Sequence, residues 1–426
     1  MRKPDYGIKR KPPAFIGKIP KLYPWLSEDR HCDICVIGGG LTGAMCAMAA
    51  AEMGLSVTLI TSGGVGFGST GHSTGCAQFD CGSTLTEADR VMSTDEALRL
   101  YALGFEALDD LGNLCNALDG EYKKSGLSAD FIRSDSLLFT SDPTELELME
   151  REYIARNKKF SGCTFITRKT AENSFEFPIC GGILTKEGGA ALNPYALAHL
   201  CLMKAEELGA GIFEQTEALD IQTPKKNEGC VIIKTSTYRT IYADRLIFAT
   251  GSKGIRAMTE RSRKYISFTE IAPLPEGTAG WSGKCILRTF GGRERNGISS
   301  VIRPDGKIAV STVCKSGIIE KFSRRDETNF AKYDKLRETI QKLLPDVSET
   351  KIQYEYSYEF SAIYDGLPII GRHEEYKNCL FALCGLSGIF TEAALPVFSQ
   401  IARNCAVKML ESNSTENDPL FDPMRL

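Results

Sequence analysis

A chain of 426 residues with 42% hydrophobic and 25% charged residues has the composition of a globular protein large enough for two domains. Its net charge of −3 argues against nucleic acids and anionic membranes as partners. Because there is no secretory leader, and the apolar run 44–51 is far too short to span a membrane, we expect a cytoplasmic protein, monomeric or oligomeric.

Residues 1–30 are predicted to form a basic N-terminal arm. Lysine or arginine occupies positions 2, 3, 9, 10, 11, 18 and 21, and Asp5 is the only acid among the first 21 residues. Such a segment is typical of a solvated arm lying over the surface, and the alternative is an arm that docks a partner.

Residues 33–62 carry the strongest local pattern of the chain. The stretch DICVIGGGLTGAMCAMAAAEMGLSVTLITS predicts a strand, a glycine turn, a helix and a second strand, the unit that binds dinucleotides. The first glycine permits the tight turn, the second lets the backbone approach a diphosphate, and the third lets the helix lie close to the strands. The helix then directs its positive end at the phosphates, although a purely structural turn is the alternative. The predicted contacts are Gly38, Gly40, Leu41, Thr42 and Gly43.

One element of the dinucleotide pattern is missing. An acidic residue usually binds the ribose about 20 residues further on, but Thr61 and Ser62 stand in that place. A hydroxyl group can still hydrogen-bond a ribose, without the charge-assisted strength of a carboxylate.

A glycine-rich loop follows at 63–75, and it suits a backbone that wraps round a ligand, a flexible linker being the alternative. The predicted cofactor contacts in it are Gly68, Ser69, Thr70 and Thr74. His72 is a candidate catalytic residue near a redox ring, with a structural role as the alternative.

The middle of the chain predicts helices on the dinucleotide domain and a further strand unit. Residues 84–118 show helical apolar spacing, 131–141 read as a strand pair of a different sheet, and 143–157 as a charged helix. Asn193 and Pro194 start an amphipathic helix. The strand 212–216 then ends near Ala218, where an adenine could meet backbone groups.

Two more glycine turns follow apolar strands. The first, after 246–249, contains Thr250 and Gly251 at the edge of a nucleotide site. Between the turns, 264–313 predict a mostly antiparallel sheet and 326–344 a charged helix. The second turn follows DGLPIIG and the strand 379–383, and its helix end could stabilise negative charge on a reduced cofactor ring. Its predicted contacts are Gly371, Gly385, Leu386, Ser387, Gly388 and Ile389. The tail from residue 411 is polar and expected to be loose.

The fifteen cysteines are expected to be reduced thiols. Cys32 and Cys35 form a CxxC pair, but a zinc site needs a second ligand pair and none is evident, so no metal is predicted.

Together these blocks resemble the FAD-dependent D-amino-acid oxidase superfamily, the group that includes glycine oxidase, sarcosine oxidase and gamma-glutamylputrescine oxidase. The matching stretches are DICVIGGGLTGAMCA, VGFGSTGHSTG, GGAALNPYALAHLCLMKAEELGAGIFEQT, RLIFATG and DGLPIIG followed by LCGLSGI. The resemblance implies an α/β (α+β) fold with a Rossmann-like FAD-binding domain interleaved with a mostly antiparallel substrate domain. The ranges expected are 1–30 for the arm, 31–118, 150–262 and 360–411 for the FAD-binding domain, 119–149 and 263–359 for the substrate or cap domain, and 412–426 for the tail.

The same resemblance implies the chemistry. A C–N bond of a small amine or amino-acid derivative would be oxidised by hydride transfer to flavin N5, giving an imine that hydrolyses, with the electron acceptor left open. Non-covalent FAD is expected, because Tyr358 stands where the sarcosine-oxidising members carry the cysteine that holds the flavin. Alternatives are a non-catalytic flavin-binding accessory protein and an NAD-dependent dehydrogenase.

The departures from the family concern the substrate. The arginine that grips a substrate carboxylate is absent before DGLPIIG, which favours a larger amine or an N-substituted compound over a simple amino acid. Arg288 and Arg303 are candidate carboxylate partners, and Tyr364 joins His72 as a further catalytic candidate.

Overall fold

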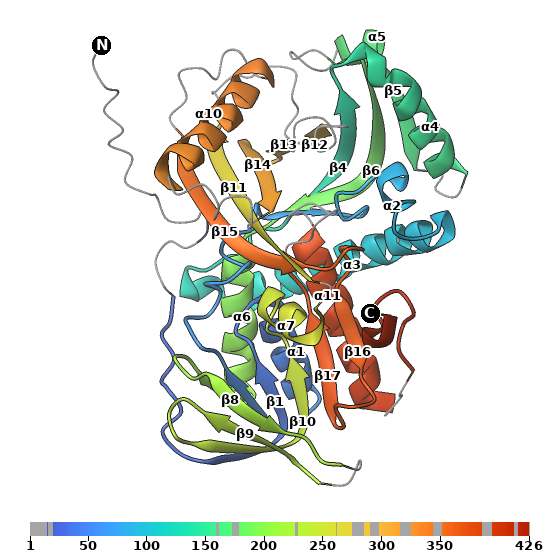
Figure 1. Ribbon diagram of the computed structural model, residues 1–426. Coiled ribbons are helices and arrows are strands. Elements are labelled where there is room, and N and C mark those ends of the chain that lie inside the picture. Colours follow the sequence, from blue (N-terminus) through green and yellow to red (C-terminus); the bar gives the residue numbers. More distant parts are fainter. Residues whose placement is uncertain are drawn as a thin grey trace.

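The computed structural model describes residues 15, 20–158, 162–172, 179–225, 229–260, 262–274, 285–289, 298–315, 325–343, 352–385, 394–412 and 416–425. Within them the chain builds two sheets, one above the other in Figure 1, and each sheet draws strands from distant parts of the sequence.

The lower sheet has eight strands, six of them in the order β16-β17-β10-β1-β2-β7. Its strands are β1 (Arg30–Ile37), β2 (Val57–Ile60), β7 (Gly211–Phe213), β8 (Ala218–Gln222), β9 (Val231–Thr235), β10 (Thr240–Phe248), β16 (Ile369–Arg372) and β17 (Cys379–Leu383). β1 pairs in parallel with β2 and β10, β2 with β7, and β10 with β17. β9 and β16 add antiparallel edges. The parallel strands therefore end at one edge, where the glycine turns lie.

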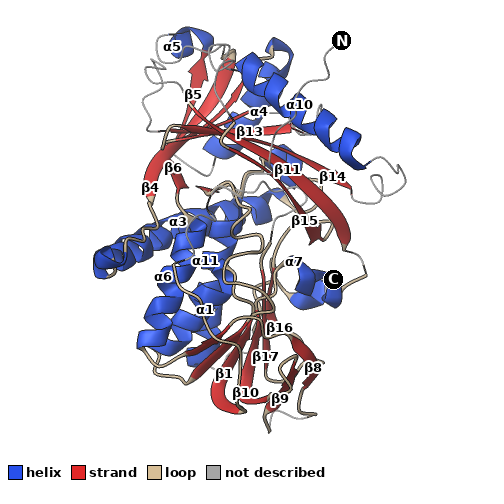
Figure 2. Ribbon diagram, turned by 90° about the vertical axis from the view of Figure 1, so that its left-hand side faces the viewer, coloured by secondary structure: helices blue, strands red, loops and turns tan. Residues whose placement is uncertain are grey.

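Long helices cover one face of this sheet (Figure 2). They are α1 (Leu41–Glu52), α6 (Pro194–Glu207) and α11 (Ala394–Ser412), and α3 (Thr94–Glu121) packs on α6 and α11 between the two sheets. Residues 41–51 of α1 are all buried, because this helix packs against α6 and α11 as well as the sheet. The small glycine and alanine residues of α1 permit that close approach on every side. Because every side is covered, α1 has no polar face.

The upper sheet has nine strands, eight of them in the order β15-β11-β14-β13-β12-β4-β6-β3, with β5 paired to β6. Its strands are β3 (Cys76–Gln78), β4 (Ile132–Thr140), β5 (Cys163–Thr167), β6 (Gly181–Ala191), β11 (Arg263–Pro273), β12 (Cys285–Thr289), β13 (Ile298–Arg303), β14 (Lys307–Lys315) and β15 (Tyr354–Ala362). The pairing is antiparallel except between β12 and β4. α10 (Arg325–Leu343) packs on β11 and β14.

Shorter helices join these layers. They are α2 (Leu85–Ala88), α4 (Leu146–Asn157), α5 (Arg168–Glu172), α7 (Ser252–Met258) and the 3₁₀ turns η1 (Lys123–Ser125), η2 (Pro143–Glu145) and η4 (Pro423–Arg425). α7 contacts both β15 and β17, so it links the two sheets directly after the glycine turn at Thr250 and Gly251. The α/β (α+β) class with a parallel and a mostly antiparallel sheet is confirmed.

Two local expectations were wrong. Residues 131–141 form the single strand β4 rather than a strand pair. Residues 163–191 fall in the ranges expected for the FAD-binding domain, but β6 pairs with β4 and β5 pairs with β6 in the upper sheet. Strand partners that lie far apart in sequence leave no local signal, whereas the helix start at Asn193 and Pro194 does, and α6 begins there.

The C-terminal tail is not loose in its described part, which corrects the sequence-based expectation. Phe421 is fully buried and its carbonyl accepts a hydrogen bond from the N–H of Ile370 at 2.9 Å. Arg425 Nε donates to Asp365 Oδ2 at 3.0 Å. The polar composition of the tail conceals one apolar pair, Leu420 and Phe421, that is enough to anchor it against β16.

In the described ranges, no helix has both the length and the apolar character needed to cross a bilayer. The cysteines whose side chains are described are free thiols, Cys32 and Cys35 among them. No group of three or more histidine, cysteine or acidic side chains suited to a metal ion comes together in that part of the chain.

Candidate active site

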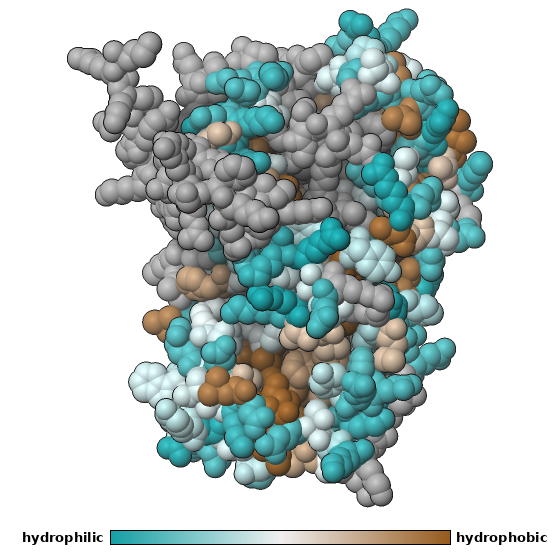
Figure 3. Space-filling view, in the orientation of Figure 1, coloured by the Kyte–Doolittle hydropathy of each residue, from teal (hydrophilic) through white to brown (hydrophobic). Residues whose placement is uncertain are grey.

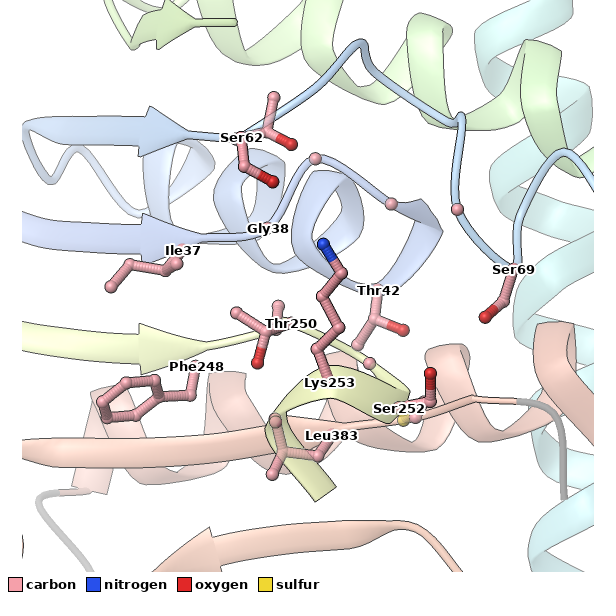
Figure 4. Close-up of a pocket in the computed structure, with 18 of the residues that line it drawn as sticks. Ile37, Gly38, Thr42, Ser62, Ser69, Phe248, Thr250, Ser252, Lys253 and Leu383 are labelled. Carbon is pink, nitrogen blue, oxygen red and sulfur yellow. The ribbon is translucent and has the colours of Figure 1, made fainter. Parts of the chain in front are cut away.

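A cavity of about 840 Å³ lies where the parallel strands end (Figure 4). The glycine turn after β1, the loop after β2, the start of β8 and the turn after β10 all contribute to its wall. The predicted cofactor contacts that line it are Gly38, Gly40, Leu41, Thr42, Thr61, Ser62, Gly68, Ser69, Thr70, Ala218, Thr250 and Gly251. The structure therefore brings together residues from four separate sequence blocks.

The glycine turn is shaped by two contacts with no room for a side chain. A Cβ atom on Gly38 would lie 2.2 Å from the carbonyl oxygen of Ala249, and one on Gly43 would lie 1.9 Å from the carbonyl oxygen of Gly38. Gly38 also has a φ of +124°, which disfavours any residue with a side chain. Gly43 thus packs the helix against the turn and does not itself line the cavity.

The first turn of α1 leaves backbone donors at the cavity. Leu41 N–H donates to Thr70 Oγ1 at 2.9 Å, and Ala44 N–H donates to the Gly40 carbonyl at 2.9 Å. The N–H groups of Thr42 and Gly43 have no acceptor within the described ranges. A helix start with two such donors and its positive dipole end is suited to a phosphate group.

Thr61 and Ser62 lie in the wall expected to face a ribose. The Thr61 side chain packs on Gly39, where an added Cβ would lie 3.0 Å from Thr61 Cβ. Glu217, an exposed acid at the start of β8, lines the same cavity. The sequence pattern predicted an adenine near Ala218 but indicated no role for the carboxylate of Glu217. The position of this acid directly before Ala218 was the available signal.

Lys253 is a further cavity residue that sequence reasoning missed. It lies two residues beyond Gly251, in the first turn of α7, and its side chain extends across the cavity toward the turn between β1 and α1 (Figure 4). Among the described residues it has no ion-pair partner. A lysine so close to a glycine turn was the available signal.

The lower part of the cavity wall is apolar. A brown hollow lies below α7, between β8 and β17, in Figure 3. Ile221, Phe248, Met258 and Phe381 line the cavity there, and the Phe248 and Phe381 rings stack at 4.9 Å. A flat apolar wall of this kind suits an adenine ring.

The upper wall brings a side chain from the antiparallel sheet to the glycine loop. Tyr358, from β15, lines the cavity, and Ser69 Oγ donates to its hydroxyl at 3.4 Å. The His72 ring stacks on the Tyr358 ring with centroids 4.6 Å apart, and His72 Nδ1 donates to the Gly68 carbonyl at 2.9 Å. Burial lowers the pKa of His72, so its imidazole is neutral at pH 7.

Arg303 is held within the protein rather than left for a substrate carboxylate. The side chain is only 4% exposed, and its Nε and Nη2 donate to the two Asp305 carboxylate oxygens at 2.9 and 3.0 Å. Its Nη1 donates to the carbonyl of Thr74. This arginine therefore fixes the end of the glycine loop, with Thr74 buried beside it.

The remaining predicted residues lie elsewhere. Tyr364 is 57% exposed and outside the cavity wall. Gly371 packs against Asn417 of the tail, and Gly385 lies next to Ser252. The Arg288 side chain and the turn residues Leu386, Ser387, Gly388 and Ile389 lie outside the part of the chain that the structure describes.

A phosphate cradle at the ends of parallel strands, covered by an antiparallel sheet, defines a dinucleotide-dependent oxidoreductase of two interleaved sheets. The chain belongs to the FAD dependent oxidoreductase family (DAO), whose sequence pattern matches residues 33–393. This finding confirms the resemblance seen in the sequence and identifies FAD as the cofactor, against the NAD-dependent alternative. The free N–H group of Thr42 and the ammonium group of Lys253 fit the diphosphate of that cofactor.

Individual relatives are more distant. The chain is 27% identical over 235 residues to "Probable oxidoreductase OrdL" of Haemophilus influenzae, covering 54% of this chain and 51% of that protein. It is 25% identical to gamma-glutamylputrescine oxidoreductase of Escherichia coli, covering 41% of this chain and 39% of that protein. These matches span about half or less of the curated relatives.

The solved structure of glycine oxidase from Geobacillus kaustophilus is similar with a TM-score of 0.73 at 17% identity. The match covers 93% of this chain and 99% of that chain. At this level of identity the similarity establishes the fold.

Proposed function

We propose that the protein is an FAD-dependent oxidoreductase that oxidises a C–N bond of a small amine or amino-acid derivative. The observation that carries this proposal is a single cavity that is lined both by the phosphate cradle and by Tyr358 of the upper sheet, on whose ring His72 of the glycine loop stacks. FAD held in this cavity would supply the acceptor for a hydride from the carbon next to the substrate nitrogen; with loss of the nitrogen's proton the substrate would become an imine, which would hydrolyse in water.

Within this proposal, residues of the cavity wall bind the diphosphate, ribose and adenine of FAD. The N–H group of Thr42 and the ammonium group of Lys253, both of which line the cavity, bind the diphosphate. Hydroxyls of Thr61 and Ser62, together with the Glu217 carboxylate, bind the ribose. The apolar wall described above receives the adenine.

Non-covalent attachment is part of the proposal. Cys384 is the one cysteine of the described residues that lines the cavity. Burial raises the pKa of its thiol well above the usual range, so it stays protonated and is a poor nucleophile. Tyr358 occupies the position where a covalent attachment would be expected from the family resemblance.

On the substrate side, the Tyr358 hydroxyl binds and orients the substrate nitrogen, and the neutral His72 ring fixes the plane of Tyr358 by stacking. The Asp305 partner of Arg303 neutralises the described arginine candidate for a carboxylate. We therefore favour amines and N-substituted compounds over simple α-amino acids as substrates.

The protein is also proposed to work in a reducing compartment, the cytoplasm. Fourteen free thiols in the described residues support this location, because partly exposed thiols such as Cys180 and Cys230 stay reduced in a reducing compartment.

The test is flavin reduction. Purified protein reconstituted with excess FAD should show flavin absorbance near ~450 nm, and a panel of amines and N-alkyl amino acids added without oxygen should include one that bleaches it. A protein that binds FAD but is bleached by no compound of the panel would instead be a non-catalytic flavin-binding accessory. Tyr358→Phe should lower the rate of bleaching while leaving the FAD content unchanged.

A further inference from the structure

A second cavity, of about 970 Å³, lies at the other side of the lower sheet. Its wall comes from β10, the end of β16, the residues between β16 and β17, the end of α11 and the described part of the tail. It contains none of the residues assigned above to the cofactor. Tyr376 borders both cavities, so they share one side chain in their walls.

Two arginines of this cavity stand on the same face of the sheet. Arg372 of β16 is opposite Leu380 of β17, and Leu380 is the neighbour in register of Ile247 through the pairing of β17 with β10. Arg245 precedes Ile247 by two residues, and alternate residues of a strand share a face. The arginine Cα atoms are therefore two strands apart, about 10 Å across the sheet, and both side chains reach the cavity.

The positive charge of this pair has no counter-charge in contact. Arg372 Nη2 donates to the Met409 carbonyl at 3.0 Å, at the C-terminal end of α11. Arg245 Nη1 is buried and has no hydrogen-bond partner in the described residues. Within the same residues, no carboxylate forms an ion pair with either arginine. Burial, and to a smaller extent the charge of Arg245, lower the pKa of Arg372.

The nearest acids are otherwise engaged or point to solvent. Asp33, on the strand next to Arg245, accepts hydrogen bonds from the N–H and hydroxyl of Ser56. Asp422 accepts from Asn417 Nδ2 and from the N–H of Met424. Asp244 and Glu374 are exposed. Both arginines are partly buried, and a guanidinium whose buried Nη1 lacks a hydrogen-bond partner next to a second cation is destabilising unless an anion binds there.

We propose that this second cavity binds a small anionic molecule whose phosphate or carboxylate group lies between Arg245 and Arg372. Guanidinium groups match both anions through paired N–H donors, and a cavity of this size accommodates a molecule larger than the anionic group alone. The proposal does not depend on the substrate proposed above, because none of the residues that carry it contacts the cofactor cavity.

Calorimetric titration of the FAD-saturated protein tests the proposal. Pyrophosphate and citrate, at constant ionic strength, are the probes, and their comparison distinguishes a phosphate site from a carboxylate site. We expect saturable binding of at least one probe, weakened about tenfold or more in Arg245→Gln and in Arg372→Gln, because each loses a charge-assisted contact. Arg239→Gln is the matched control, since Arg239 is exposed and outside the cavity, and it should bind like the wild type.

A measurement on the unaltered protein covers the case in which an arginine variant does not fold. Phenylglyoxal labelling with peptide mass spectrometry should show that the bound probe protects Arg245 and Arg372 but not Arg239. Absence of saturable binding by both probes, equal affinity in all three variants, or equal labelling with and without probe would each overturn the proposal.

Discussion

The two sheets treat their polar groups in opposite ways. Around the lower sheet, the first turn of α1, Lys253 and the pair Arg245 and Arg372 keep binding capacity that the described chain does not use. Around the upper sheet, charges are paired with each other. Arg156 is 1% exposed and donates to Glu152 and Asp80, and Arg337 forms an ion pair with Glu355. Among the described residues, cations without a carboxylate partner therefore mark the two cavities better than the presence of charge alone.

The largest effect is expected when the buried charge pairs of Arg156 with Asp80 and Glu152 are broken. Arg156→Met leaves Asp80 and Glu152 buried without their cation, and we expect it to lower the free energy of unfolding by about 3–5 kcal/mol. Arg151→Met is the control from the same helix, because its pair with Glu147 is exposed and is worth at most about 0.5 kcal/mol. Denaturant unfolding compares the two variants, and similar losses in both would contradict the contrast.

Next comes the close packing of the cofactor cradle. Gly43→Ala places a methyl group 1.9 Å from the Gly38 carbonyl oxygen, and we expect a loss of about 2–3 kcal/mol in stability together with loss of bound FAD. Gly120→Ala, where nothing lies within 4 Å of the added atom, should change neither quantity appreciably. Thermal unfolding and flavin content after desalting measure both, and full FAD retention by Gly43→Ala would show that the turn tolerates displacement.

The stability of the protein is expected to depend on pH through Glu270, a buried residue of β11 in the upper sheet. Burial and the nearby Glu355 outweigh Arg337 and raise the pKa of Glu270 to about 8 from its ordinary 4.5. The folded protein thus keeps a proton that the unfolded chain releases. The stability from this group is full below about pH 4.5 and is lost as the pH rises through 8.

We expect Glu270→Gln to remove about 3–4 kcal/mol of the decline in unfolding free energy between pH 5 and pH 8. Glu359→Gln is the control, because Glu359 forms an exposed pair with Lys264 on the same sheet. Unfolding at both pH values decides the matter. A decline as steep in Glu270→Gln as in the wild type would mean that Arg337 keeps this carboxyl ionised.

Removing the unpaired charge of Lys253 is expected to have a smaller effect, limited to the affinity for FAD. Lys253→Gln removes one charge-assisted contact to the diphosphate and should weaken FAD binding about tenfold without changing the fold. Arg256→Gln, on the same helix but outside the cavity, should keep the wild-type affinity. Fluorescence titration of the apoprotein with FAD measures both, and equal affinities would place Lys253 away from the phosphates.

The smallest effect concerns the missing ribose acid. Thr61→Val removes a neutral hydroxyl contact and should weaken FAD binding about fivefold, whereas Thr61→Glu should strengthen it by restoring the carboxylate. The same titration serves as the measurement. Unchanged affinity in both variants would show that the ribose is bound by other groups, Glu217 among them.

The sequence predicted the parts of the site that are contiguous. The unit from Gly38 to Gly43 was readable because the spacing between glycines sets the turn and the helix start together. Glu217 and Lys253 were not assigned roles, because they can bind the cofactor only in a cavity whose other walls come from distant strands. Arg303 looked available as a free cation, yet its partner Asp305 lies only two residues away across the turn that joins β13 to β14. The contact of His72 with Tyr358 depends on pairing between distant segments, which no local pattern records.

The interleaving of the lower sheet has a consequence for synthesis on the ribosome. β10 is complete at Phe248, but its parallel neighbour β17 begins only at Cys379, after most of the upper sheet has been made. At elongation rates of about 5–20 residues per second that gap lasts on the order of ten seconds. During that time the edge of β10 that faces β17 lacks its partner strand and the helix α11 has not emerged to cover α1. We therefore expect nascent chains of this protein to depend on chaperones that shield exposed strand edges, and to aggregate when translation stalls between these two strands.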